Sequence, residues 1–156
     1  MFSLQSCTVN DNAPVVDHDT ISTTFENASP YSFTPNNNFS VKFNFPNPIY
    51  ASDMVLVYRL SEIYQGQDVW KLLPETHYFS NGSRDFGYDY DFTKYDVKIY
   101  LLGNDLVSVP SGNRLGQYFR IVVVPADLVK AVNVNKYDEL VKALNIKENE
   151  IQQIQF

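Results

Sequence analysis

Two strongly apolar segments limit the folds open to this sequence. Residues 53–60 read DMVLVYRL, and residues 117–125 read QYFRIVVVP. Neither approaches the length of about 20 apolar residues that a membrane-spanning helix needs. A strand with apolar residues at successive positions is typical of the middle of a sheet covered on both faces. We therefore expect residues 53–60 to form a central strand and residues 117–125 a second strongly apolar strand.

Other segments alternate between apolar and polar residues. The clearest is FSVKFNF at residues 39–45, which places three Phe and one Val on one face and Ser, Lys and Asn on the other. This period of two predicts a strand with one solvated face. Residues 20–27 and 95–102 are also expected to be strands. Residues 76–92 predict a hairpin, with Asn81-Gly82 supplying the two positive-φ positions of a tight type I′ turn.

The pattern changes after Pro125. Apolar residues at positions i, i+3, i+4 and i+7 predict a short helix, with Asn135 as its N-cap: Tyr137, Leu140, Val141 and Leu144. The last residues, EIQQIQF, favour a final strand with Ile154 and Phe156 on one face. The sequence thus predicts a mainly β protein. We expect an antiparallel, immunoglobulin-like β-sandwich over residues 19–156, with a short C-terminal helix.

Composition excludes several classes of function. The chain has 156 residues, and its 12 Lys and Arg are outnumbered by 18 Asp and Glu. Nucleic-acid binding needs clustered cations, and here they are scattered, so no nucleic-acid partner is expected. Cys7 is the only cysteine, which excludes an intramolecular disulfide and a multi-cysteine metal site. No cofactor is expected.

The segment before residue 19 carries the evidence on location. Leu4-Gln5-Ser6-Cys7 is similar to a bacterial lipobox, whose cysteine receives a lipid anchor. Residues 1–18 would then include a flexible tether, and the membrane contact would be through Cys7 alone. Six residues cannot hold the n-region and h-region of a signal, so this interpretation requires that Met1 is not the natural start. The alternative is a lone cysteine in an irregular leader, in a cytoplasmic protein.

Four segments in order carry a family resemblance: DMVLVYRL, DVWKLLP, FRIVVVPAD and YDELVKALNI. Across residues 53–156 the chain resembles small secreted or lipid-anchored proteins of unassigned function from the Bacteroidota. The resemblance implies an extracytoplasmic β-domain, at the outer membrane or cell surface, and brings no catalytic residues. Asp19-Thr20-Ile21 is similar to the O-glycosylation signal of that phylum.

The segment DFGYDYDFTKYD, residues 85–96, is the most distinctive motif. Side chains alternate along a strand, so Asp85, Asp89 and Asp91 share one face. The spacing does not match a calcium-binding loop, which needs a glycine and a bidentate glutamate at fixed positions. A composite calcium or ligand site that includes Asp105 stays open. The alternative is a solvated acidic face that discourages edge-to-edge pairing, and this is the interpretation we prefer.

Aromatic residues supply the other candidate site. Tyr88 and Tyr90 could stack on a sugar if their face of the strand were exposed and the aspartate face were buried. Trp70 could do the same, or could be the core aromatic residue of the sandwich. His18 and His77 are the only histidines, and neither lies in a recognisable catalytic motif.

The sequence therefore predicts a non-catalytic, extracytoplasmic binding or structural module with an unknown extracellular protein or glycan as partner. Recognition is expected in loops carried on a rigid scaffold, at residues 36–38, 81–84 and 103–116. One alternative is a carbohydrate-binding module that uses exposed aromatic residues. Another is a small hydrolase with a pair of acidic residues in a cleft.

Overall fold

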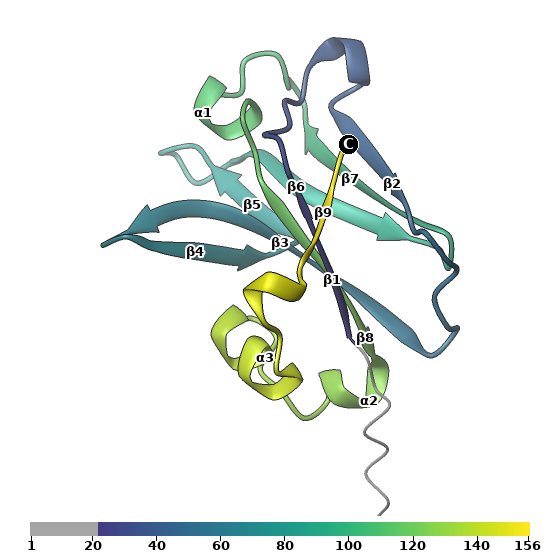
Figure 1. The fold of residues 1–156 in the computed structure, drawn as a ribbon. Coiled ribbons are helices and arrows are strands. Elements are labelled where there is room, and N and C mark those ends of the chain that lie inside the picture. Colours follow the sequence, from purple (N-terminus) through teal and green to yellow (C-terminus); the bar gives the residue numbers. More distant parts are fainter. Residues whose placement is uncertain (1–21) are drawn as a thin grey trace, which may run out of the picture.

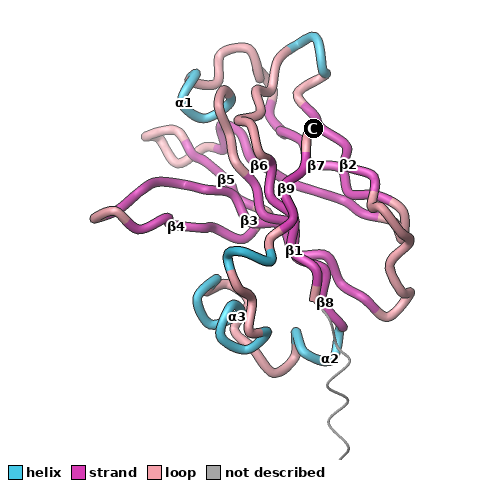
Figure 2. Tube along the Cα trace, viewed as in Figure 1, coloured by secondary structure: helices cyan, strands magenta, loops and turns pink. Residues whose placement is uncertain are grey.

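The computed structural model describes residues 22–156 and shows a sandwich of two β-sheets (Figures 1 and 2). The predicted mainly β, sandwich architecture is confirmed. The immunoglobulin-like character stays a prediction. The expected division into a leader of residues 1–18 and a domain from residue 19 also stays a prediction, because its boundary lies outside the described residues.

The first sheet has five strands in the order β4-β3-β8-β1-β9. Its strands are β1 (Thr23–Asn27), β3 (Asp53–Tyr64), β4 (Gln67–Leu72), β8 (Phe119–Pro125) and β9 (Gln152–Ile154). The pair β1–β9 is parallel, and the other pairs are antiparallel. The two apolar segments became β3 and β8, neither of which is an edge strand.

The second sheet has four antiparallel strands in the order β2-β7-β6-β5. They are β2 (Ser40–Asn44), β5 (Glu75–Tyr78), β6 (Arg84–Phe92) and β7 (Asp96–Gly103). The predicted hairpin is β5–β6, but its turn differs from the expectation. Gly82 alone of the Asn81-Gly82 pair has a positive φ, of 83°, and the Asn81 side chain instead accepts a hydrogen bond from the Ser83 backbone N–H at 2.9 Å. A five-residue loop replaces the expected two-residue turn.

The main core lies between the sheets, and strand periodicity decides which residues reach it. On β3, Val55 and Val57 point into this core, while Leu56 and Tyr58 point to the opposite face. On β8, Ile121 belongs to this core, whereas the next residue along the strand, Val122, points to the opposite face. Both faces of these strands are therefore buried, as their continuous apolar sequence predicts.

Helices cover the outer face of the first sheet. They are α2 (Ala126–Val129), α3 (Tyr137–Leu144) and the 3₁₀ turn η2 (Glu148–Glu150). Figure 1 shows α2 and α3 on the side of this sheet that faces away from the second sheet. The predicted cap is wrong: Lys136 is the N-cap residue, and it makes no side-chain capping bond. Packing of the apolar stripe therefore holds the helix in place without a cap.

The remaining short elements lie at the other end of the sandwich. They are the 3₁₀ turn η1 (Pro35–Asn37) and α1 (Ser111–Arg114). Figure 2 shows helical segments at two opposite ends of the molecule, with the strands between them. The β3–β4 hairpin projects beyond the second sheet (Figure 1). Across residues 22–156, no helix has the length and apolar character needed to cross a membrane.

Candidate functional site

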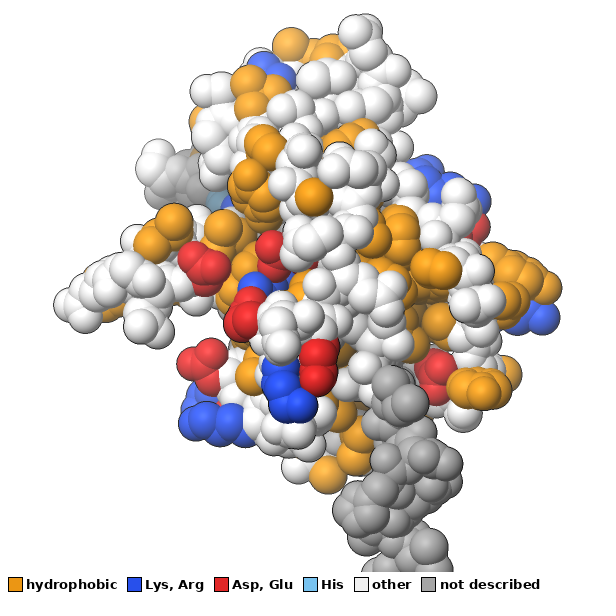
Figure 3. Space-filling view, viewed as in Figure 1, with side chains coloured by type: hydrophobic (Ala, Val, Ile, Leu, Met, Phe, Trp, Pro, Cys, Tyr) orange, Lys and Arg blue, Asp and Glu red, His pale blue; other side chains and the backbone are white. Residues whose placement is uncertain are grey.

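A groove of about 540 Å³ lies where β1 and β8 meet the connection between β2 and β3. Its volume falls within the range of roughly 300–1,000 Å³ that small-molecule pockets have. Figure 3 shows hydrophobic side chains gathered at the right-hand end of the molecule, where this connection and the β6–β7 turn lie. The lining residues are Thr23, Phe25, Phe45, Pro46, Asn47, Pro48, Ile49, Tyr50, Ser52, Asp53, Val123, Pro125 and Gln152.

The loop of residues 45–52 forms one wall of the groove, and backbone hydrogen bonds hold it at three points. The N–H groups of Phe45 and Ile49 donate to carbonyls of the β6–β7 turn, residues 93–95, at 2.8 and 2.9 Å. The carbonyl of Ser52 accepts from the N–H of Ala126 at 3.0 Å. Two prolines further restrict the backbone of this loop. The wall is therefore positioned before any ligand arrives, which lowers the entropic cost of binding.

Aromatic residues occupy both the base and the rim of the groove. Phe25 and Phe45 are buried, and their ring centroids lie 6.1 Å apart. Tyr50 is 79% exposed. Its backbone is fixed by a short turn, because the Tyr50 N–H donates to Asp53 Oδ2 and the Asp53 N–H donates to the Tyr50 carbonyl, both at 3.0 Å. The groove thus combines a buried apolar base with an exposed ring on an anchored backbone.

The polar part of the lining consists of hydroxyl, amide and carboxylate groups. They come from Thr23, Asn47, Ser52, Asp53 and Gln152. Among residues 22–156, Asp53 is the only charged residue in the lining. The described part of the groove can therefore hold an apolar surface, can donate and accept several hydrogen bonds, and offers no cation to an anionic ligand.

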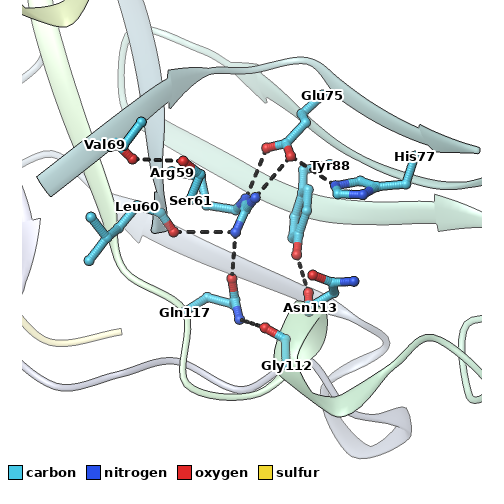
Figure 4. A network of polar contacts seen from close by, with 10 residues as sticks. All are labelled: Arg59, Leu60, Ser61, Val69, Glu75, His77, Tyr88, Gly112, Asn113 and Gln117. Carbon is cyan, nitrogen blue, oxygen red and sulfur yellow. Dashed lines mark hydrogen bonds and ion pairs between the residues drawn. The ribbon is translucent and has the colours of Figure 1, made fainter. Parts of the chain in front are cut away.

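A second feature is a polar network between the sheets (Figure 4). Arg59, on β3, is 5% exposed. Its Nε and Nη2 atoms donate to the two carboxylate oxygens of Glu75, on β5, at 2.9 and 2.8 Å. Its Nη1 atom donates to the side chain of Gln117 at 3.1 Å and to the Leu60 carbonyl at 3.2 Å. The guanidinium is thus paired by both carboxylate oxygens and two further acceptors.

The charges of this network affect one another. Burial alone would raise the pKa of Glu75. The hydrogen bond and charge of Arg59, with smaller contributions from His77 and Lys71, outweigh burial, so the pKa of Glu75 lies below its ordinary value of 4.5. His77 stacks on Phe86 with ring centroids 4.3 Å apart. Its Nε2 atom is 2.8 Å from Glu75 Oε1, close enough for an ion pair when protonated but not aligned as a hydrogen bond.

Tyr88, on β6 of the second sheet, also belongs to this network. Its ring lies under the Arg59 guanidinium, whose central carbon is 4.5 Å from the ring centroid. Its hydroxyl donates to the carbonyl of Asn113. Burial raises the pKa of Tyr88 to about 12, and the opposing effect of Arg59 is smaller. Since Arg59 and Glu75 are already bonded to each other, we interpret the network as a cross-link between the sheets.

The aspartates of the distinctive motif lie on the outer face of β6. On β6, Asp89 and Asp91 lie opposite Tyr100 and Lys98 of β7. Their strand neighbours Phe86 and Tyr88 belong to the core, so Asp85, Asp89 and Asp91 lie on the outer face, half-buried or exposed. Asp105 instead accepts hydrogen bonds from Ser108. Within residues 22–156, no three His, Cys, Asp or Glu side chains gather as metal ligands.

The sugar-stacking hypothesis for the aromatic residues of the motif is not supported. Tyr88 is 1% exposed, and the Tyr90 hydroxyl donates across the core to the Val55 carbonyl at 2.8 Å. The condition that this face be exposed is therefore not met. Trp70 packs outside the inter-sheet core, half-buried beneath α3, with its ring 5.9 Å from that of Tyr137. It is a core aromatic residue, but of the second cluster.

Sequence reasoning missed the residues that form the groove. The loops it singled out, at residues 36–38, 81–84 and 103–116, do not contribute to the lining. Residues 46–50, PNPIY, follow the strand expected at residues 39–45 and match no known motif. Their two prolines beside an aromatic residue were the available signal of a rigid, exposed loop. The lipid-attachment candidate Cys7 lies outside the described residues.

The sequence matches no protein-family model, and neither curated proteins nor solved structures show significant similarity to it.

Proposed function

We propose that this protein is a non-catalytic binding module whose ligand occupies the groove between β1, β8 and the loop of residues 45–52. The observation that supports it is the combination of a pre-positioned wall with an exposed aromatic ring, Tyr50, over a cavity of about 540 Å³. Pockets with an apolar lining and a few convergent polar groups are the usual sites of ligand binding. The hydrolase alternative requires two carboxyl groups in a cleft, whereas the described residues contribute one to the lining, that of Asp53.

Blocking the groove tests the proposal. In a Cys7→Ser background, Asn47→Cys places the only thiol in the groove wall, where a polyethylene-glycol maleimide can be attached. Asn81→Cys in the β5–β6 loop, outside the lining, is the matched control. Both labelled proteins are applied to an array of neutral oligosaccharides and short peptides. We expect binding by the unlabelled protein and the Asn81 conjugate, and its loss in the Asn47 conjugate. Equal binding by both conjugates, or no binding by the unlabelled protein, contradicts the proposal.

We propose that this module acts outside the cytoplasm, anchored through Cys7. The support is the lipobox-like Leu4–Cys7 segment and the resemblance to secreted Bacteroidota proteins. Intact-mass analysis of the protein from its native cells tests this part separately. A diacyl or triacyl mass on Cys7, with residues 1–6 removed, is the expected result. An unmodified Met1 with a free thiol on Cys7 contradicts it.

A further inference from the structure

The chemistry of the groove indicates the class of its ligand, an inference that rests on the proposed function. We propose that the groove binds an uncharged oligosaccharide, with one sugar ring stacked on Tyr50 and its hydroxyl groups bonded to the amide and hydroxyl side chains of the lining. Four observations support this: the exposure of Tyr50, the types of polar group, the absence of Arg and Lys among the described lining residues, and the size of the cavity.

Tyr50 provides the stacking surface. It is 79% exposed, more than any other exposed large hydrophobic residue described, and the hydrogen bonds between Tyr50 and Asp53 fix its backbone. A tyrosine side chain has two rotatable angles, so ordering it costs little entropy on binding. The C–H groups on one face of a sugar ring form a flat apolar surface that matches such a ring.

The polar groups of the lining match sugar hydroxyls. Each hydroxyl of a sugar both donates and accepts hydrogen bonds. The amides of Asn47 and Gln152 each supply donors and acceptors, and the hydroxyls of Thr23 and Ser52 do the same. Carboxylate oxygens, here those of Asp53, accept from hydroxyl groups. A set dominated by neutral groups that both donate and accept suits a ligand with many hydroxyls and no net charge.

The charge of the lining argues against anionic ligands. Asp53 is the only charged residue that the described part of the chain contributes to it, and the whole chain carries a net charge of −6. Phosphorylated and sulfated ligands are usually held by Arg or Lys, and no Arg or Lys of residues 22–156 lines the groove. A basic peptide remains the main competitor, because it would pair with Asp53 and place apolar side chains against Phe25 and Phe45. The test must therefore separate a sugar from a basic peptide.

The size of the cavity favours an oligosaccharide over a monosaccharide. A volume of about 540 Å³ lies in the middle of the range of roughly 300–1,000 Å³ for pockets that hold drug-sized ligands. The wall of the groove is bonded to the β6–β7 turn, in which Tyr95 is a second exposed tyrosine, at 55%.

Titration calorimetry with defined probes tests the inference. The probes are mannohexaose, xylohexaose, cellohexaose and β-1,4-galactohexaose, with a sulfated heparin hexasaccharide and a short lysine–valine peptide as competitors. We expect at least one neutral hexasaccharide to bind, and both competitors to bind more weakly or not at all. Tyr50→Ala should weaken that binding about tenfold, the equivalent of one good aromatic contact. Tyr64→Ala, at an exposed tyrosine on the opposite end of β3, should change it by less than about twofold.

A salt titration of the wild-type protein separates the ligand class from the site. Saccharide binding should not depend on salt, whereas binding of a basic peptide that pairs with Asp53 should weaken as the salt concentration rises. If the peptide binds in the groove and the hexasaccharides do not, the saccharide inference is overturned while the proposed binding site stands. If no probe binds, or if Tyr50→Ala and the Asn47 label leave binding unchanged, both proposals are overturned.

Discussion

The guanidinium of Arg59 and the carboxylate of Glu75 face each other across the sandwich and form two hydrogen bonds of 2.9 and 2.8 Å. Arg59 belongs to the first sheet and Glu75 to the second. Their side chains are 6% and 11% exposed, so the pair is shielded from most solvent screening. This contact fixes the position of one sheet relative to the other at the end where the β3–β4 hairpin projects.

Removing one partner of this pair should be costly. Arg59→Met leaves the carboxylate of Glu75 without its main partner, and breaking a buried ion pair typically costs about 3–5 kcal/mol. We expect a loss of stability near the lower end of that range in urea unfolding. The double variant Arg59→Met with Glu75→Leu should recover part of the loss, because it leaves no unpaired charge.

The surface pair Lys42–Asp96 provides the control. Lys42 is 56% exposed in its side chain, and exposed ion pairs contribute about 0–1 kcal/mol. Lys42→Ala should therefore change stability little. A loss in Arg59→Met no larger than that in Lys42→Ala contradicts the cross-link interpretation.

Acid should weaken the Arg59–Glu75 contact. The folded pKa of Glu75 lies below its ordinary value of 4.5, so the ionised form is favoured by folding. Its stabilising effect is present above pH 4.5 and is lost as the pH falls through the folded pKa. The stability difference between the wild type and Glu75→Gln should therefore be largest at neutral pH and shrink as the pH falls below 4.5. A difference that stays constant over this interval contradicts the assigned pKa shift.

High pH should destabilise the folded protein by favouring ionisation of Tyr88. Burial raises its folded pKa to about 12 from an ordinary value of 10.0, so folding favours the neutral phenol. This contribution is complete below pH 10 and is lost as the pH rises toward about 12. Unfolding followed by circular dichroism should show a smaller fall in stability over this range for Tyr88→Phe than for the wild type. An equal fall in stability with pH for the wild type and Tyr88→Phe would contradict this assignment.

The C-terminal segment depends on a second buried arginine. Arg120, 5% exposed, donates to Glu26 at 2.5 Å, to Glu148 at 2.7 Å and to the Tyr137 hydroxyl at 2.9 Å. Its central guanidinium carbon lies 4.4 Å from the Trp70 ring centroid. It therefore connects β1, β4 and β8 to α3 and η2.

Arg120→Leu should loosen this segment first. Because Glu148 is largely exposed, we expect a loss of about 2 kcal/mol, less than for a fully buried pair. Hydrogen exchange should increase most in residues 137–154 and less in β6 and β7. Lys147→Ala, which removes an exposed ion pair with Glu150, should leave exchange nearly unchanged. Uniformly faster exchange throughout Arg120→Leu contradicts a local role.

Side-chain periodicity was sufficient to predict most of the strands but not their neighbours. The alternation in residues 39–45 and the continuous apolar run on β3 depend only on local sequence, and both predicted their strands. Trp70, a candidate for the core aromatic residue of the sandwich, packs under α3 outside the inter-sheet core, because periodicity separates two faces without revealing what covers each. The pairing of Arg59 with Glu75 depends on which strands stack, and the sequence carries no local signal of that.

The candidate site was harder to predict for a related reason. The groove joins residues from β1, the loop of residues 45–52, β8 and β9, which are separated by most of the chain. Their polar residues are ordinary Thr, Asn, Ser and Gln, which attract no attention in sequence. The repeated aspartates of β6 do attract attention, but their role in the structure is to form the outer face of a strand whose aromatic residues fill the core.

The most direct test of the groove as the binding site is a nuclear magnetic resonance titration of ¹⁵N-labelled protein with the same neutral hexasaccharides. We expect the backbone amide signals that shift to belong to residues 23–25, 45–53 and 152. Signals that shift only in the β3–β4 hairpin or on the aspartate face of β6, or no shifts with any hexasaccharide, would contradict it.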